Sequence, residues 1–258
     1  MGLNMVEVVD PNMSYALTRK AALESKGKNA SWVQQDLPAN FRIYLSLIKQ
    51  RFPVGFHLDI GTDNGEKAIK MLVAGLDPMV AFDIDPLNIA LPQAKLLASE
   101  AGVSDKITFL KADARVEIPV LDNSVTSATS ICVAGTHFTN EERVNFSDML
   151  FDKMVPSGLL LSVDFSASDV EFYGEPICNS DGSPRSREYH YLPNLDHPHA
   201  KPNYKGMFNQ HHTEDEMREL YGQRFKLLSL IHIIHPNSIK DSEHATRYLW
   251  QSIYQRVQ

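Results

Sequence analysis

The chain has 258 residues, of which 43% are hydrophobic and 22% are charged, the proportions of a globular protein rather than of a disordered or fibrous one. Its 25 Lys and Arg against 32 Asp and Glu leave a formal charge of −7, which argues against a protein that grips nucleic acid through a basic face. The two cysteines, Cys132 and Cys178, stand far apart, so neither a disulfide framework nor a cysteine zinc site is expected.

The N-terminal part, residues 1–53, reads as helix and loop. It shows no secretory signal, and no apolar stretch of the chain is long enough to span a bilayer, so we expect a cytoplasmic protein with no membrane partner. Apolar residues recur at helical spacing over 15–23 and 41–48, and Pro53 follows the second stretch. We predict that this helical extension forms a cofactor lid or part of an acceptor pocket, with a role in packing alone as the alternative.

From residue 54 onward, short apolar runs alternate with helical stretches. This alternation predicts βαβ units and a mostly parallel sheet with helices on both faces. The predicted strands are 56–60, 79–84, 107–110, one within 125–133, 158–165, 225–234 and 246–254. The predicted helices between them are 66–76, 87–100, 139–154 and 213–221. Pro92 is expected to kink the second of these or to delay its start. The last two strands are expected to pair antiparallel at the edge of the sheet.

A segment with little periodicity, 168–212, separates the fifth predicted strand from the sixth. Its length is typical of a lid or an inserted subdomain rather than of a structureless loop. The helices on either side of it each open with a Thr-x-x-Glu capping box, at Thr139 and at Thr213. We therefore predict a Rossmann-like, doubly wound α/β domain over 54–258, with a mostly parallel seven-stranded sheet, an antiparallel edge hairpin and this insertion.

The most informative stretch reads Leu-Asp-Ile-Gly-Thr-Asp-Asn-Gly over residues 58–65 and joins a predicted strand to a predicted helix. Gly61 at the strand end permits a positive φ and a close approach of a ligand, and the helix that follows presents unpaired N–H groups. A tight turn without a ligand is the alternative for Gly61 and Gly65. A dinucleotide fingerprint is excluded because Asp63 replaces its second glycine, and a triphosphate-binding loop is excluded because Glu66 follows Gly65.

Acidic residues accompany three successive predicted strands, at Asp59, Asp83 and Asp113. Asp83 can accept hydrogen bonds from both hydroxyls of a ribose, and Ile84 beside it can lie against a purine. Asp113 and Ala114 are placed to read the edge of that purine through a carboxylate or a backbone N–H. Each acid alone is more often a solvated loop residue, but ligands of open α/β sheets bind at this edge, which favours a shared site.

These motifs resemble those of the class I S-adenosylmethionine-dependent methyltransferases, over 54–165 and, less closely, over the last two predicted strands. The matching pieces are Leu-Asp-Ile-Gly-Thr-Asp-Asn-Gly, Ala-Phe-Asp-Ile-Asp-Pro, Leu-Lys-Ala-Asp-Ala, Leu-Asp-Asn-Ser-Val and Met-Val-Pro-Ser-Gly-Leu-Leu-Leu. The resemblance implies S-adenosylmethionine as cofactor and S-adenosylhomocysteine as product. It implies these binding residues: Asp59, Gly61, Thr62 and Gly65 for the methionine moiety, Asp83 for the ribose, Ile84, Asp113 and Ala114 for the adenine, and Ser130 beside the methionine end.

The sequence departs from the family pattern in three places. Asp63 stands where a middle glycine is often seen, and residues 122–126 read Asp-Asn-Ser-Val-Thr where Asp-Asn-Ser-Phe-Asp is usual. Residues 130–133 read Ser-Ile-Cys-Val and lack the Asn/Asp-Pro-Pro-Tyr/Phe motif. The last departure argues against methylation of base or glutamine amide nitrogens.

Methyl transfer from a sulfonium is an in-line displacement, so the protein mainly has to align the reactants, and a hydroxyl or protonated amine acceptor also needs a base. His137, after the fourth predicted strand, is the first candidate because the unperturbed pKa of histidine suits the task. Asp164, at the end of the fifth, is the second. A histidine bonded to the backbone and a capping or solvated acid are the alternatives. Tyr189 and Tyr191 either line an aromatic acceptor pocket or pack the insertion.

Histidines gather in the insertion, at His190, within Asp-His-Pro-His over 196–199, and at His211 and His212. Such a set can bind zinc or iron, but Pro198 constrains its spacing and no helical His-x-x-x-His occurs there, so we expect no metal. The acidic charge and single-domain length favour a methyltransferase acting on an O or N atom of a small-molecule acceptor, with a homodimer left open. The alternatives are a protein or RNA methyltransferase, a non-catalytic cofactor-binding regulatory protein, and an enzyme that uses the sulfonium without transferring its methyl group.

Overall fold

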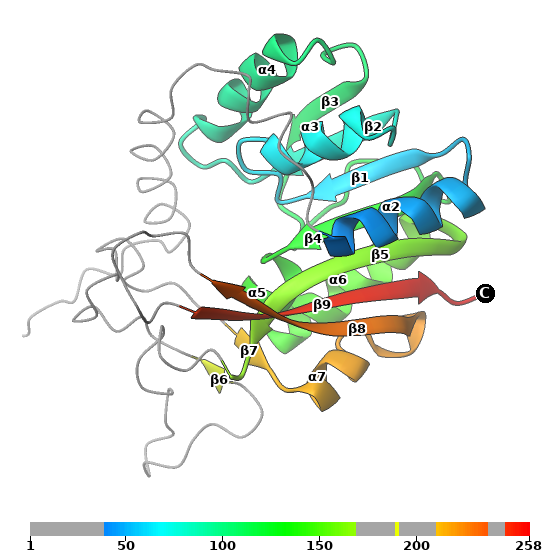
Figure 1. The fold of residues 1–258 in the computed structure, drawn as a ribbon, viewed down its shortest axis with the longest axis vertical. Coiled ribbons are helices and arrows are strands. Elements are labelled where there is room, and N and C mark those ends of the chain that lie inside the picture. The colour runs from blue at the N-terminus through cyan, green and yellow to red at the C-terminus, as the bar shows by residue number, and fades with distance from the viewer. Residues whose placement is uncertain (1–38, 169–188, 191–209, 237–245) are drawn as a thin grey trace, which may run out of the picture.

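The computed structural model describes residues 39–168, 189–190, 210–236 and 246–258 (Figure 1). The predicted helix at 15–23, most of the insertion and Tyr191 lie outside these residues, so the predicted lid stays a prediction. No helix within the described ranges has both the length and the apolar character needed to cross a membrane.

A single nine-stranded sheet runs through the described part of the chain. Its strands are β1 (Phe56–Ile60), β2 (Met79–Asp83), β3 (Ile107–Lys111), β4 (Val125–Ile131), β5 (Met154–Ser166), β6 (Tyr189–His190), β7 (Gln210–His212), β8 (Phe225–Pro236) and β9 (Thr246–Arg256). β3, β2, β1, β4 and β5 are parallel neighbours in that order. β9 lies between β5 and β8 and runs antiparallel to both. The seven predicted strands and the antiparallel pair are thus confirmed.

Two short strands were not predicted. β7 adds three residues parallel to the end of β5, and β6 pairs antiparallel with β7. Both lie in the segment expected to lack periodicity, and a strand of two or three residues is too short to show an alternating pattern.

The helices are α2 (Ala39–Arg51), α3 (Glu66–Val73), α4 (Ala90–Glu100), α5 (Ala134–His137), α6 (Asn140–Lys153), α7 (Glu214–Glu219) and the 3-10 helix η3 (Gly222–Arg224). Both predicted capping boxes are present. The Thr139 and Thr213 hydroxyls accept the backbone N–H groups of Glu142 and Glu216, and the carboxylates of these two glutamates accept the backbone N–H groups of the two threonines. α4 begins three residues after Leu87, a delayed start of the kind that Pro92 led us to expect. Before and at this start the Asp85 carboxylate accepts three consecutive backbone N–H groups, those of residues 89–91. α5 was not predicted, because four residues carry no helical period.

The two faces of the sheet are covered by different helices. α2, α3 and α4 pack on one face, where Tyr44, Ile69 and Leu161 belong to one buried cluster. α5, α6 and α7 pack on the other, where Phe146 and Leu160 belong to a second. Figure 1 shows α2 in front of the strands and α6 behind them. This two-sided covering confirms the doubly wound α/β class.

α2 is fixed to the middle of the sheet by a polar contact as well as by packing. The hydroxyl of the fully buried Tyr44 lies 2.7 Å from the carbonyl oxygen of Ala128 and 3.2 Å from that of Leu159. The described end of the N-terminal extension is therefore part of the core of the domain.

A buried histidine in β1 is expected to make the fold sensitive to acid. His57 is 4% exposed and contacts the Ser127 hydroxyl on β4. Burial lowers the pKa of His57 to about 4, so between about pH 6.5 and pH 4 the unfolded chain binds a proton that the native state excludes. The unfolding free energy should therefore fall by about 3 kcal/mol across that window.

His57→Asn tests this expectation by urea unfolding at pH 7 and pH 4. The loss of unfolding free energy on acidification should be smaller in the variant than in the parent, whatever the stability of each at pH 7. Replacement of the exposed His232 by Asn serves as the control and should keep the parental loss. Equal losses in the parent and in His57→Asn would contradict the prediction.

Candidate functional site

The carboxyl ends of the five parallel strands form one edge of the sheet, where ligands of open α/β sheets bind. Pairing places Ile60 beside Phe82 and Ser130, and Asp83 beside Lys111, so these strands end at similar heights. In the ends of β1 to β4, or in the loops that follow them, lie Asp59, Gly61, Thr62, Gly65, Asp83, Ile84, Asp113, Ala114 and Ser130, and His137 ends the short helix after β4.

The loop from Gly61 to Gly65 folds over the end of β2. The N–H groups of Gly61 and Thr62 both donate to the carbonyl oxygen of Phe82, at 2.9 and 3.0 Å. Gly61, Asp63 and Gly65 have φ values of 68°, 53° and 73°, in the left-handed region that favours glycine. The loop thus needs its two glycines for its own backbone, and Asp63 adopts the same conformation despite its side chain.

Asp83 connects this loop to β2. Its Oδ2 accepts the backbone N–H of Asp63 at 2.9 Å, and its Oδ1 accepts that of Asp85, also at 2.9 Å. Hydrogen bonds to an ionised acceptor are stronger than those between neutral groups, so the two bonds fix the orientation of the carboxylate. Asp83 is therefore held at the edge of the sheet where the sequence predicted a ribose-binding acid.

Asp59 is buried one residue before the end of β1, where the Thr129 hydroxyl of β4 donates to it. Burial raises the pKa of Asp59, the Thr129 hydrogen bond and the charge of Lys67 oppose that effect, and the nearby Asp83 raises it further. A cationic group near Asp59 would favour the ionised form of its carboxyl. Thr129 was missed by the sequence analysis because only the strand register pairs it with Asp59.

The structure gives the Asp113 carboxylate a partner that the sequence analysis did not single out. Arg115 Nε lies 3.0 and 3.2 Å from its two oxygens, and a terminal nitrogen lies 2.7 Å from Oδ2. Partial burial alone would raise the pKa of Asp113, but the hydrogen bonds and charge of Arg115 outweigh it and hold the pKa below its ordinary value. An adenine contact through this carboxylate would have to be shared with Arg115. The Ala114 side chain is buried in the core, and Ile84 is half-buried.

Ser130 and His137 both belong to the short segment that follows β4. Ser130 is fully buried, and its Oγ accepts the Ala134 N–H at 3.2 Å, so the hydroxyl holds the start of α5. The predicted position of Ser130 beside the methionine end of the cofactor stays a prediction. His137 is the last residue of α5 and is half-exposed, with its backbone N–H 2.7 Å from the Val133 carbonyl oxygen. Its role as a base on the acceptor side stays a prediction.

Asp164 is enclosed beneath α5 instead of facing the edge. It is 0% exposed, accepts the Ser162 hydroxyl at 2.6 Å and lies 3.3 Å from the Thr136 hydroxyl. The Tyr221 hydroxyl lies 2.8 Å from Ser162 Oγ and extends the cluster. Because α5 covers this carboxylate, Asp164 is badly placed to take a proton from an acceptor at the edge. The sequence could locate this acid at a strand end but not decide which side of the sheet it faces.

The buried carboxyl is expected to weaken the fold as pH rises. Burial raises the pKa of Asp164 to about 6, against the opposing effects of Ser162, Arg143 and Thr136. The native state therefore keeps a proton that the unfolded chain releases above about pH 4, so unfolding free energy is lost between pH 4 and pH 6, by about 3 kcal/mol. The charged or titratable groups of the neighbouring elements are Arg143 on α6, His212 on β7, Tyr221 and, on β9, Tyr254.

Asp164→Asn removes this titration. The unfolding free energies of variant and parent should be measured in urea at pH 4 and at pH 8. Between these two values the variant should gain about 3 kcal/mol of unfolding free energy relative to the parent. A difference that does not change with pH would show that Asp164 does not titrate in this range.

The two described histidines of the predicted cluster bond to the backbone. His211 Nδ1 lies 3.0 Å from the Ser166 carbonyl oxygen, and His212 Nε2 lies 2.6 Å from that of Gly135. Within the described ranges no group of three or more His, Cys, Asp or Glu residues is arranged to hold a metal ion. Residues 191–209, with the Asp-His-Pro-His stretch, and the side chains of Tyr189 and His190 lie outside the description.

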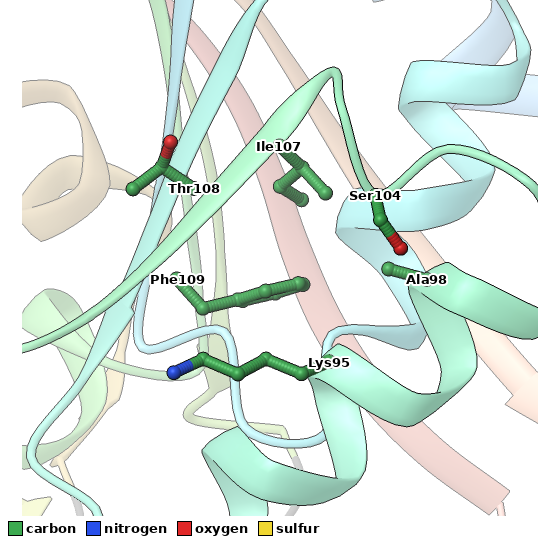
Figure 2. Close-up of a pocket in the computed structure, with 6 residues that line it drawn as sticks. All are labelled: Lys95, Ala98, Ser104, Ile107, Thr108 and Phe109. Atoms are coloured by element: carbon green, nitrogen blue, oxygen red, sulfur yellow. The ribbon is translucent and has the colours of Figure 1, made fainter.

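A shallow hollow of about 320 Å³ lies between α4 and the start of β3 (Figure 2). It is lined by Lys95, Ala98, Ser104, Ile107, Thr108 and Phe109. None of these was predicted as a site residue, and the hollow sits toward the amino end of β3, away from the edge where the acids gather.

The sequence matches no family model, and no curated protein matches it significantly. Solved structures do match. An S-adenosylmethionine-dependent methyltransferase from Methanosarcina mazei has a TM-score of 0.64 at 18% identity, covering 86% of this chain and 99% of its own. The 1,6-didemethyltoxoflavin N1-methyltransferase of Burkholderia thailandensis, solved with 1,6-didemethyltoxoflavin and S-adenosylhomocysteine, has a TM-score of 0.59 at 14% identity and covers 98% of this chain and 93% of its own. The cyclase SpnF has a TM-score of 0.55 at 13% identity, over 83% of this chain and 81% of its own.

At these identities the likeness concerns the fold. The chain has the fold of the class I S-adenosylmethionine-dependent methyltransferases, as its sequence motifs predicted. One fold can support several reactions, so the function depends on the residues at the carboxyl edge of the sheet.

Proposed function

We propose that the protein is an S-adenosylmethionine-dependent methyltransferase that transfers a methyl group to an O or N atom of a small-molecule acceptor. The observation that carries the proposal is the carboxylate of Asp83, oriented at the end of β2 by the N–H groups of Asp63 and Asp85. A carboxylate fixed in this way is an acceptor for the two hydroxyls of a ribose.

The chemistry of the surrounding groups fits this cofactor. Asp83 supplies negative charge toward a ligand that carries a sulfonium and an ammonium group. Burial raises the pKa of Asp59, and a cationic ligand group beside it would favour its ionised form. The buried Nδ2 of Asn64, in the same loop, has no hydrogen-bond partner among the described residues and is a donor suited to a carboxylate. Acids without a lysine-containing triphosphate loop would instead repel a nucleotide phosphate.

The bound cofactor supplies an activated methyl group, and the residues of this chain bind and orient it. Asp83 holds the ribose and Ile84 packs on the adenine, while Asp59, kept in place by Thr129, faces the ammonium group. His137 takes the proton from a hydroxyl or ammonium acceptor. Alignment of the acceptor with the methyl group contributes most of the rate, roughly 7–11 kcal/mol in ideal cases.

The small-molecule acceptor is favoured by the formal charge of −7, because an RNA substrate calls for a basic surface. The Burkholderia thailandensis enzyme of the same fold bears the name of a small-molecule methyltransferase. Action on protein or RNA is the second candidate. A lid formed by the part of the N-terminal extension that precedes α2, a homodimer and a cytoplasmic location belong to the same proposal.

The proposal is tested by isothermal titration with S-adenosylmethionine and then with S-adenosylhomocysteine. We expect one molecule of either to bind per chain, and no binding of either at millimolar concentration would overturn the proposal.

Transfer is tested with methyl-labelled S-adenosylmethionine and separate small-molecule, protein and RNA fractions of a cell extract. Label in the small-molecule fraction, lost in His137→Ala, is expected. Label confined to protein or RNA would overturn the acceptor class. Cofactor binding without label in any fraction would favour a non-catalytic role or an enzyme that does not transfer the methyl group.

A further inference from the structure

Three contacts hold the four-residue helix α5 against the sheet. Ser130 Oγ accepts the N–H of Ala134, and the Gly135 carbonyl oxygen lies 2.6 Å from Nε2 of His212. Because a carbonyl can only accept, Nε2 carries the hydrogen, which agrees with a His212 whose pKa burial lowers to about 4. The third contact is with Asp164, beneath the helix.

The Asp164 carboxylate meets α5 at two consecutive residues. The carboxylate lies directly against the Gly135 backbone, and the Thr136 hydroxyl lies 3.3 Å from Oδ1. A Cβ atom at Gly135 would lie 2.3 Å from Oδ1, so only glycine lets the acid come this close. The acid is itself fixed from the other side by Ser162.

The segment that Asp164 holds also touches the proposed cofactor loop. Val133, the residue before α5, packs so closely on Gly61 that a Cβ there would lie 2.4 Å from Val133 Cγ2. At the other end of α5 stands His137. A shift of α5 would therefore be felt both at the Gly61 loop and at the proposed base.

We propose that Asp164 is a positioning residue: its buried carboxylate fixes α5 and, through Val133 and His137, sets the shape of the proposed cofactor loop and the place of the proposed base. The term cofactor loop rests on the proposed function, but the fixing of α5 does not. Burying a carboxyl group destabilises a fold unless hydrogen bonds compensate for the lost hydration. Here the compensating contacts include two consecutive residues of the short helix beside the proposed site.

Three variants separate positioning from packing. Asp164→Ala removes the carboxylate, and Thr136→Val removes one of its donors while keeping the shape of the side chain and the acid. The control is Tyr254→Phe, which removes another buried hydroxyl on the same face of the sheet, one that bonds to the Met217 carbonyl oxygen and not to α5.

The first readout is hydrogen exchange of the backbone amides of α5, compared with global stability from urea unfolding. In Asp164→Ala and in Thr136→Val these amides should exchange at least about tenfold faster than in the parent, the size expected for one lost hydrogen bond to a charged group. Tyr254→Phe should leave them within about twofold. Equal exchange of α5 in Thr136→Val and Tyr254→Phe would overturn the proposal, even if Asp164→Ala does not fold.

The second readout is the affinity for S-adenosylhomocysteine. It should fall about tenfold in Asp164→Ala and Thr136→Val, for the loss of the same hydrogen bond, and be unchanged in Tyr254→Phe. If the exchange effect is found and the parent does not bind S-adenosylhomocysteine, the proposed function fails while the fixing of α5 by Asp164 stands. If the parent binds and these variants bind equally well, the link from α5 to the cofactor loop fails.

Discussion

Replacing Asp83 with Asn should weaken binding of S-adenosylhomocysteine by at least about 100-fold. Hydrogen bonds to a charged group contribute about 1.5–3 kcal/mol each, and the proposed ribose contact involves two hydroxyls. The variant also loses one of the two acceptors that hold the N–H groups of Asp63 and Asp85, because an amide nitrogen cannot accept. The Gly61 loop would then be less well fixed to the end of β2. Isothermal titration of variant and parent at the same pH gives the ratio of affinities directly.

The matched control is Asp122→Asn. Its side chain is 65% exposed and pairs with Lys153 on the surface, so the substitution makes the same chemical change far from the proposed site. Affinity within about twofold of the parent is expected there, since exposed ion pairs contribute little. Unfolding curves of both variants show whether the native state is intact. A well-folded Asp83→Asn protein that binds as tightly as the parent would remove the observation on which the proposed function rests.

Gly61→Ala should cost about 3 kcal/mol of unfolding free energy and also weaken cofactor binding. Two effects add at this position. The φ of 68° strains any residue with a Cβ atom, and that atom would lie 2.4 Å from Val133 Cγ2. The β-branched Val133 has little freedom to turn away. The expected response is a shift of the β4–α5 segment, which bears His137. Urea unfolding and titration with S-adenosylhomocysteine measure the two effects separately.

Gly102→Ala provides the control because it isolates backbone strain. Gly102 has a φ of 69°, nearly that of Gly61, but an added Cβ would meet nothing within 4 Å. This variant should lose only about 1–2 kcal/mol and keep its cofactor affinity. If both variants lost the same stability and the same affinity, the close contact between Gly61 and Val133 would have no energetic importance.

Hydrophobic periodicity was sufficient to predict the layers of the fold. Each of the seven main strands carries its own apolar run, and the capping boxes at Thr139 and Thr213 correctly predicted where two helices begin. Elements too short to repeat a period were not predicted, namely β6, β7 and α5. Pro92 indicated that α4 could start late, but the role of the Asp85 side chain, which accepts the N–H groups at the helix start, was not predicted.

The site was predictable only where a residue's role follows from its place at a strand end. Asp83 and the Gly61 loop lie together as expected because parallel strands end at one edge. The surroundings of Asp113 and Asp164 were not predictable, because they depend on Arg115 reaching back two residues and on α5 covering the end of β5. Thr129 and Tyr44 act across the sheet, through contacts that sequence spacing does not encode.

The placement of β9 has a consequence for how the protein is made. β9 follows every other described strand in the chain, yet it occupies an interior place between β5 and β8, and β8 pairs with no other described strand. During synthesis, β5 therefore has an unpaired edge and β8 has no partner strand until β9, residues 246–256, has been made. Exposed edges of this kind favour pairing between chains, so β5 and β8 are open to intermolecular pairing until β9 takes its place between them.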